Sequence, residues 1–326
     1  MIETMPQLEM EGYKGQDTIP QNFSFFWDDV VSAINQYELS YKLVPKPLGF
    51  DFVDCYELFF NALDGSEIYA KVSFPKKEKC PIIFKFHGYQ GQSSDWSESF
   101  KYIAAGIGVV MMDVRGQSGK STDHSIHSGN TVKGHIIRGV QDGPDNLFYK
   151  NVYEDSLILM RIISQLPQVD ETNLMTLGDS QGGALALVSA ALNPEIKRVF
   201  SVYPFLSDFR RVLQLNYDTE AYDELHRYFK FSDPLYETES IFFETLGYID
   251  VKNFASRIRG EITMVCGLQD DVCPPSTQYA IYNRLRCKKK LYILPEYGHE
   301  SLNVKIPDLI FNWAVNKDKL NEEEVK

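Results

Sequence analysis

The sequence lacks a long hydrophobic run, and this absence argues against a membrane protein. No stretch approaches the roughly 20 apolar residues of a membrane-spanning helix. The first residues, MIETMPQLEMEGYKG, contain neither a basic leader nor an apolar segment, so we expect no signal peptide. Basic residues are also scarce, because 33 Lys and Arg stand against 45 Asp and Glu and give a net charge of −12. Nucleic acids and anionic membranes bind basic surfaces, so neither is expected as a partner.

Cysteine is sparse and unpatterned. The sequence has five cysteines, none of them in a CxxC pair, at positions Cys55, Cys80, Cys266, Cys273 and Cys287. An odd, scattered set favours reduced thiols over a disulfide framework or a zinc site. We therefore expect a cytoplasmic protein that needs no metal.

The chain has enough apolar material for a large core. Of its 326 residues 44% are hydrophobic and 24% are charged, which is typical of a globular protein. Short apolar runs without alternation predict strands that are buried on both faces, at 81–86, 108–113, 173–178, 198–204, 261–267 and 289–295. Helical spacing of apolar residues predicts helices at 22–35, 152–166, 185–192 and 309–315. Strands that alternate with helices indicate an α/β fold with a doubly wound, mostly parallel sheet.

Two segments depart from this alternation. Before the first buried strand, Asp64-Gly65 lies between two strand-like runs and predicts an N-terminal antiparallel hairpin. Residues 207–258 contain many aromatic and charged residues but no strand-like run. We interpret this interval as a helical insertion into a single domain that spans 1–326. The insertion can serve as a lid or pocket wall, as extra packing, or as an oligomer contact, and the sequence leaves these alternatives open.

The run GDSQG places Ser180 between glycines, directly after a predicted strand and before a predicted helix. This is the G-x-S-x-G pattern of a nucleophile elbow, in which a tight turn exposes the serine hydroxyl at the sheet edge. Gly178 and Gly182 supply the room that such a turn requires. A chance match in a glycine-rich turn is the alternative, but the strand before it and the helix after it favour a nucleophile.

A serine nucleophile needs a base within hydrogen-bond reach. His299 follows the last predicted strand, where the histidine of this arrangement belongs. The carboxylate that orients the imidazole should follow the preceding strand, where Asp270 and Asp271 are adjacent. The spacing alone does not separate these two aspartates.

The oxyanion of an acyl transfer needs N–H donors aimed at it. The amide of Gln181 follows the nucleophile and is one candidate. The second is the amide of Tyr89, in the His87-Gly88-Tyr89 loop after an early strand. His87 could instead act as a base, but its place at a strand end favours a role in holding the loop.

Several short strings in this order resemble carbohydrate esterase family seven, the acetyl xylan esterases and cephalosporin C deacetylases of the α/β-hydrolase superfamily. They are Arg115-Gly116-Gln117, the GDSQG run and His299-Glu300, together with GLQDDVCPPST at 267–277. The resemblance implies an α/β-hydrolase fold and places Asp270 at the acid position. It also implies that no metal is used, that the substrates are small acetylated carbohydrates, and that the protein is a homo-oligomer, a hexamer.

The resemblance also suggests bracing residues. Arg115, Gln117 and Glu300 are expected to hold the loops around the site, with Glu300 or Asp113 as the partner of Arg115. Asp179, beside the nucleophile, is expected to point away from the site.

We therefore expect a serine esterase that removes acetyl groups from xylo-oligosaccharides, and from cephalosporin C, through an acetyl-serine intermediate. Tyr89 and Val272, with residues of the insertion, are expected to wall a small acyl pocket. One alternative is another hydrolase of the same fold, prolyl peptidase-like or dienelactone-type. Another is a non-catalytic binding protein.

Overall fold

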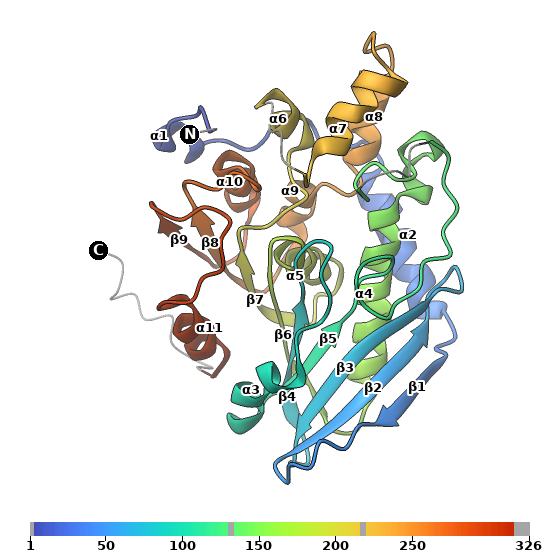
Figure 1. Ribbon diagram of the computed structural model, residues 1–326, viewed down its shortest axis with the longest axis vertical. Helices are drawn as coiled ribbons and strands as arrows, with labels where there is room; N and C mark the ends of the chain where they lie inside the picture. Colours follow the sequence, from blue (N-terminus) through green and yellow to red (C-terminus); the bar gives the residue numbers. More distant parts are fainter. Residues whose placement is uncertain (1–2, 130–133, 216–219, 316–326) are drawn as a thin grey trace.

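The computed structural model describes residues 3–129, 134–215 and 220–315. Its strands form one sheet in the order β1-β2-β3-β5-β4-β6-β7-β8-β9. Figure 1 shows this sheet crossing the molecule, with β1 to β3 at one end and β8 and β9 at the other. The strands are β1 Tyr41–Pro45, β2 Val53–Asn61, β3 Glu67–Pro75, β4 Cys80–Phe86, β5 Gly108–Met112, β6 Val169–Asp179, β7 Ile196–Val202, β8 Glu261–Gly267 and β9 Lys289–Leu294.

The helices lie on both faces of the sheet and above one edge. The longer ones are α2 Phe23–Gln36, α4 Phe148–Ser164, α5 Gln181–Leu192, α8 Glu239–Leu246, α10 Pro275–Arg284 and α11 Ile306–Val315. The shorter ones are α1 Gln7–Met10, α3 Phe100–Ala104, α6 Phe209–Gln214, α7 Asp223–Arg227 and α9 Val251–Phe254, with single turns η1 Trp96–Ser99, η2 Val140–Asp142, η3 Pro144–Asn146, η4 Tyr228–Ser232 and η5 Ala255–Arg257. Among the described residues, no helix is both long and apolar enough to span a bilayer.

Two pairing patterns divide the sheet. Strands β1, β2, β3 and β5 pair antiparallel, whereas β5, β4, β6, β7, β8 and β9 are parallel. From β4 the chain passes to β5 on one side and then crosses to β6 on the other. Ligands of open parallel sheets bind where the strand order reverses in this way, beyond the carboxyl ends of the strands. The loops after β4 and β6 therefore frame the expected site.

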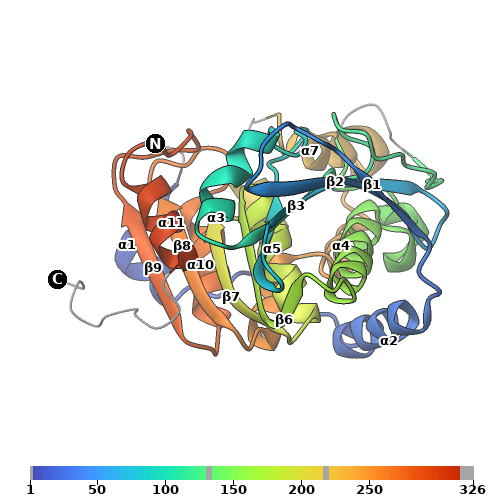
Figure 2. The same cartoon turned by 90° about the horizontal axis from the view of Figure 1, so that it is seen from below.

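Alternating side chains of the parallel strands feed two hydrophobic layers. In β4, Ile82 and Phe84 face the layer that contains α4 and α5, while Ile83 faces the layer covered by α3 and α11. Successive side chains of a strand point to opposite faces, so a strand covered by helices on both sides is apolar throughout. Figure 2 shows the two helical layers from below the sheet.

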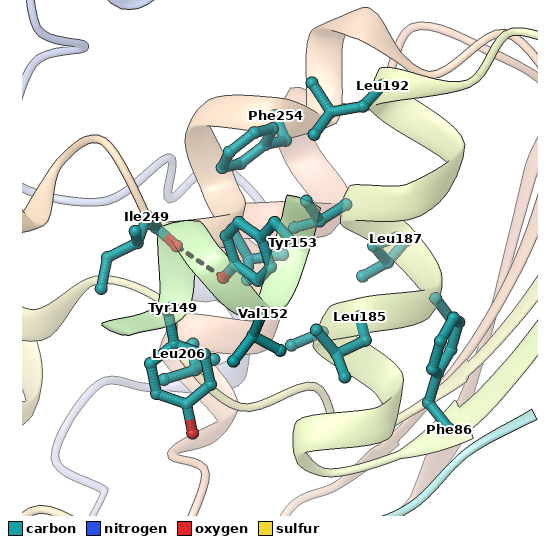
Figure 3. Packing of buried hydrophobic residues seen from close by; sticks show 14 of the residues in the cluster. Phe86, Tyr149, Val152, Tyr153, Leu185, Leu187, Leu192, Leu206, Ile249 and Phe254 are labelled. Carbon is teal, nitrogen blue, oxygen red and sulfur yellow. Dashed lines mark hydrogen bonds between the residues drawn. The ribbon is translucent and has the colours of Figure 1, made fainter. Parts of the chain in front are cut away.

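The helix that follows the nucleophile is buried on all sides. Every residue of α5 is buried, because the helix packs between the sheet, α4 and α9. Figure 3 shows Leu185 and Leu187 of α5 beside Val152 and Tyr153 of α4. The Tyr153 hydroxyl donates a hydrogen bond of 2.9 Å to the carbonyl oxygen of Ile249, which satisfies a buried polar group. This packing fixes the helix whose first turn adjoins Ser180.

The sequence predicted most of these elements. The antiparallel hairpin is β2 paired with β3, and each predicted buried strand is found within a few residues of its expected ends. The expectation of burial on both faces was wrong for β9, which is half-buried because it lies at the sheet edge. Strand β1 and helix α10 were not predicted, since neither shows a clear apolar period.

The interval 207–258 carries α6, α7, η4, α8, α9 and η5, and no strand among its described residues. In Figure 1 helices α6, α7 and α8 lie together along the top of the molecule. This interval buries many aromatic rings, and the ring centroids of Tyr228 and Phe242 stack at 4.2 Å. It is thus a packed layer over the sheet edge.

Candidate active site

Ser180 occupies a strained turn between β6 and α5. Its φ of 54° and ψ of −119° lie outside the regions that side chains favour. Its amide donates to the Val202 carbonyl oxygen at 3.0 Å, and its own carbonyl accepts from the Phe205 amide at 3.1 Å. These bonds hold the turn in place, so the surrounding structure compensates for a local strain that is typical of functional positions.

The two flanking glycines are required by close backbone approach. A Cβ added to Gly178 would lie 2.3 Å from the carbonyl oxygen of Gly182. One added to Gly182 would lie 2.1 Å from the carbonyl oxygen of Phe86 at the end of β4. Both distances are far shorter than a van der Waals contact, so the turn can form only where these two residues have no side chain. The reason given from the sequence for the glycines therefore agrees with the structure.

His299 joins Ser180 to Asp270. Its Nε2 lies 3.0 Å from the Ser180 Oγ, and its Nδ1 lies 3.0 and 3.1 Å from the two carboxylate oxygens of Asp270. The Tyr203 ring packs against the imidazole with centroids 4.6 Å apart. The three side chains predicted from the sequence thus meet in the order that serine hydrolysis requires: nucleophile, base and orienting carboxylate.

Burial and hydrogen bonding distinguish the two adjacent aspartates. Asp270 is 2% exposed, and its Oδ1 accepts the amides of Val272 at 2.9 Å and Cys273 at 2.7 Å. The Gln278 side chain donates to its Oδ2 at 3.3 Å. Asp271 is exposed. The carboxylate that faces His299 is thus that of Asp270, in agreement with the choice made from the resemblance.

The loops that carry the acid and the histidine are bound to each other. The Gln269 amide donates to the Tyr297 carbonyl oxygen at 2.9 Å. A Cβ added to Gly267 would lie 2.5 Å from that same oxygen, so this glycine permits the close approach. The Glu300 carboxylate accepts the Gly298 amide at 2.7 Å, and this bond braces the loop around His299 from within.

The loop after β4 borders the nucleophile. A Cβ added to Gly88 would lie 4.0 Å from the Ser180 Cβ. His87 is occupied structurally, because its Nε2 accepts the Val114 amide at 2.9 Å and its Nδ1 lies 2.8 Å from the Gly88 carbonyl oxygen. Its interpretation as a residue that holds the loop agrees with these bonds. The hydroxyl of Tyr89 accepts the amide of His135 at 3.0 Å.

Gln181 is fixed by a paired side-chain amide. Gln181 and Gln117 each donate to the other's oxygen, at 3.2 and 2.7 Å, and the Tyr149 hydroxyl also donates to Gln181 at 2.8 Å. Gln181 is the first residue of α5, so its backbone N–H has no acceptor within the helix. The amide therefore stays available beside Ser180 while the side chain anchors it.

Arg115 does not contact either partner proposed for it. Its guanidinium forms a two-bond pair with Asp155 of α4, at 2.7 and 2.8 Å, and donates to Asp64 at 2.6 Å. The expectation of Glu300 or Asp113 was wrong. Asp113 instead accepts the backbone amides of Ser93 at 2.7 Å and Lys120 at 2.8 Å.

The pair between Arg115 and Asp155 is almost wholly buried, each side chain being 1% exposed. Burial raises the pKa of Asp155 to about 6 despite the opposing charge of Arg115. Asp64 belongs to the predicted hairpin turn, so Arg115 ties that turn to α4 behind the site. Arg115 thus braces the molecule as expected, at a different place.

A cavity of about 310 Å³ opens in front of Ser180. Both predicted pocket residues, Tyr89 and Val272, line it, and so does Ala221 of the insertion. Asp179 also lines the cavity, so the expectation that it points away from the site was wrong. The remaining described lining residues are Gly88, Gln90, Ser180, Tyr203, Phe205, Glu220, His299 and Ser301.

Cys273 was not expected near the site. One donor atom each of Cys273, Asp270 and His299 lie within 4.8 Å of one another, a grouping that could be compared with a metal centre. Burial raises the pKa of the Cys273 thiol well above its usual range, whereas a metal ligand must be a thiolate. Because the other two members are hydrogen-bonded to each other, the group is arranged for proton transfer. The C-P-P string contained Cys273, but no spacing rule pointed to its position.

Comparison with known proteins agrees with this geometry. The family model described as acetyl xylan esterase (AXE1) matches residues 1–317. The acetyl esterase Axe7A of Xylanibacter ruminicola is 30% identical over 288 residues, which are 86% of this chain. The chain spans 63% of the length of that curated relative.

Solved structures give the same result. Acetyl xylan esterase 1 from a Thermoanaerobacterium species matches with a TM-score of 0.92 and 41% identity, over 95% of this chain and 98% of that one. An acetyl xylan esterase from a Paenibacillus species matches with a TM-score of 0.90 and 30% identity, over 95% and 99%. The fold is that of the α/β-hydrolases. The chain therefore belongs to the acetyl xylan esterase family, a family of carboxylic ester hydrolases.

Proposed function

We propose that this protein removes acetyl groups from small acetylated carbohydrates, chiefly xylo-oligosaccharides, through an acetyl-Ser180 intermediate. The observation that carries the proposal is the hydrogen-bonded chain from Ser180 through His299 to Asp270, which opens on a cavity of about 310 Å³. Family membership supports the acetyl ester as the bond that is cleaved.

In the first half-reaction the Ser180 Oγ attacks the acetyl carbonyl carbon while His299 Nε2 takes the hydroxyl proton. The Asp270 carboxylate accepts a hydrogen bond from the Nδ1–H group, without taking its proton, and stabilises the imidazolium that forms. The tetrahedral anion is stabilised by the backbone N–H groups of Tyr89 and Gln181, since N–H groups at a helix start favour negative charge. The ester C–O bond then breaks, and His299 gives its proton to the departing sugar oxygen, which leaves as a hydroxyl group.

In the second half-reaction water attacks the acetyl-serine carbonyl. His299 takes a proton from the water, and the same amides stabilise the second tetrahedral anion. When the bond to Ser180 breaks, His299 returns the proton to the serine Oγ and acetate leaves. The half-reactions use one set of groups because each requires the same base and the same oxyanion donors.

The cavity supports a preference for short acyl groups. Tyr89, Val272 and Phe205 supply apolar walls, and a cavity of about 310 Å³ shared with the alcohol part leaves little room for a long acyl chain. Cephalosporin C, also an acetyl ester, is the second substrate we propose, and it rests on the family resemblance alone.

Replacement of the nucleophile tests this function. Ser180→Ala should lower the turnover of p-nitrophenyl acetate by about 10⁶-fold, leaving only the contribution of the oxyanion donors and binding. The exposed Ser32 on α2 provides the control, because Ser32→Ala removes a hydroxyl far from the site. Circular dichroism should show both variants folded, and a fluorophosphonate should label every form except Ser180→Ala. A folded Ser180→Ala protein with near wild-type turnover would contradict the proposal.

A further inference from the structure

Asp179 stands directly before the nucleophile and faces the same cavity. It is the last residue of β6, and it lines the cavity together with Ser180 and His299. A Cβ added to Gly88 would lie 3.7 Å from its Oδ2, so the carboxylate lies over the loop that carries the Tyr89 amide. The alcohol part of a bound ester must pass close to this group.

Among the residues that the structure describes, no cationic side chain forms an ion pair with Asp179 within 4.0 Å. Of the described residues that line the cavity, two are acidic, Asp179 and Glu220, and none is lysine or arginine. The cationic side chain that most affects the pKa of Asp179 is Lys85, whose amine donates to the Ser94 hydroxyl at 3.2 Å. Within the described part of the chain, no ion pair within 4.0 Å joins Lys85 to Asp179. Desolvation by the surrounding protein raises the pKa of the Asp179 carboxyl, and the positive charge of Lys85 opposes this rise, so the charge of Asp179 is best tested at alkaline pH.

The Asp179 carboxylate affects substrate binding according to the charge that the substrate itself carries. A carboxylate several ångströms from a substrate charge, in a partly enclosed site, changes binding by about tenfold, with a sign set by the substrate. A neutral sugar is not repelled, and its hydroxyl groups can donate hydrogen bonds to the carboxylate. An ester with its own carboxylate must enter a cavity whose described charged lining side chains are acidic.

We propose that Asp179 selects substrates by charge: it favours acetyl esters with a neutral, hydroxyl-rich or cationic alcohol part and disfavours those that carry a carboxylate. This inference rests on the proposed function, because it concerns the alcohol side of the same site. It ranks the two proposed substrates, since acetylated xylo-oligosaccharides are neutral whereas cephalosporin C carries carboxylates.

A matched series of aryl acetates tests the inference. The three esters are methyl 4-acetoxybenzoate, which is neutral, 4-acetoxybenzoate, which is anionic, and 4-acetoxy-N,N,N-trimethylanilinium, which is cationic. For each ester kcat/KM is measured at pH 8 for the wild type and for Asp179→Asn. The ratio of variant to wild type cancels the different intrinsic reactivities of the leaving groups.

The ratio of kcat/KM in Asp179→Asn to that in the wild type should be about tenfold higher for the anionic ester than for the neutral ester. For the cationic ester this ratio should be lower than for the neutral ester. Glu171→Gln is the matched control, because it removes one charge from the opposite end of β6, at an exposed position. Its three ratios should be equal. In the wild type, added NaCl should raise kcat/KM for the anion and lower it for the cation, because salt screens exposed charges.

Two results overturn different claims. If the three Asp179→Asn ratios agree within twofold and salt affects the wild-type reactions equally, charge selection by Asp179 is wrong while the esterase function stands. If the wild type hydrolyses the neutral ester no faster than Ser180→Ala does, the proposed function itself is wrong.

Discussion

At the scale of single residues, the site combines a strained nucleophile with fully bonded supports. Ser180 has a positive φ, whereas Asp270 receives two backbone amides in addition to the imidazole. Because Asp270 is fixed in this way, the imidazole can keep its Nε2 directed at the serine. The fixed position of the Asp270 carboxylate, and not only its negative charge, therefore allows His299 to act as the base for Ser180.

Replacing Asp270 separates this orienting role from simple charge. Asp270→Asn should lower kcat for p-nitrophenyl acetate by about 10⁴-fold, since an amide in this place favours the wrong imidazole tautomer. The control is Asp271→Asn, because Asp271 carries the same charge one residue away and is exposed. That variant should keep wild-type kcat. Equal losses in the two variants would show that Asp270 does not act through its contact with His299.

At the scale of elements, buried polar contacts connect segments that the apolar pattern keeps separate. Arg115 joins the hairpin turn before β3 to α4, and the paired amides of Gln117 and Gln181 join the loop after β5 to α5. The second contact adjoins the nucleophile, because Gln181 directly follows Ser180. Arg115 and Gln117, which belong to one of the strings that carried the family resemblance, thus brace the elements around the site, whereas Ser180 and His299 of the other strings form its reacting centre.

Removal of Arg115 should therefore destabilise the fold. Arg115→Met leaves the buried Asp155 without its partner, which should lower the free energy of unfolding by about 3–5 kcal/mol. Urea unfolding measures the change. Arg257→Met is the control, because Arg257 pairs with Asp28, which is 63% exposed, and an exposed pair contributes about 1 kcal/mol or less. A loss at Arg115 no larger than that at Arg257 would contradict a structural role for the buried pair.

At the scale of the whole molecule, the site lies where the strand order reverses. The loops after β4 and β6 meet there, and the insertion contributes Glu220 and Ala221 to the cavity wall. The outer face of the insertion exposes large apolar side chains. They are Phe231, Leu235, Tyr236 and Ile241. Exposed apolar patches commonly mark contacts with other chains.

From the family resemblance we propose that the protein is a homo-oligomer, a hexamer, and we expect these exposed apolar side chains of the insertion to take part in its contacts. Light scattering on a size-exclusion column should give a mass about six times the 37.4 kDa of the chain. Phe231→Glu, combined with Ile241→Glu, should lower the mass without unfolding the protein. A monomer at micromolar concentration would contradict the expected hexamer.

The sequence by itself determined the buried strands, the longer helices around them except α10, and the Ser180 and His299 candidates, while the family resemblance selected Asp270 over Asp271. Apolar runs specify buried strands, the spacing of glycines around Ser180 specifies the turn, and the order of strands places His299 after the last one. These features need only neighbouring residues, so they can be read without coordinates.

Only the tertiary structure decided which polar side chains meet. Arg115 lies 51 residues from Asp64 and 40 from Asp155, and no local pattern encodes such a pairing. The place of Asp179 in the cavity wall was likewise not predicted, because the residues that enclose the end of β6 come from distant parts of the chain. Packing across distant segments determines these contacts, and they in turn determine the charge and shape of the cavity that a substrate enters.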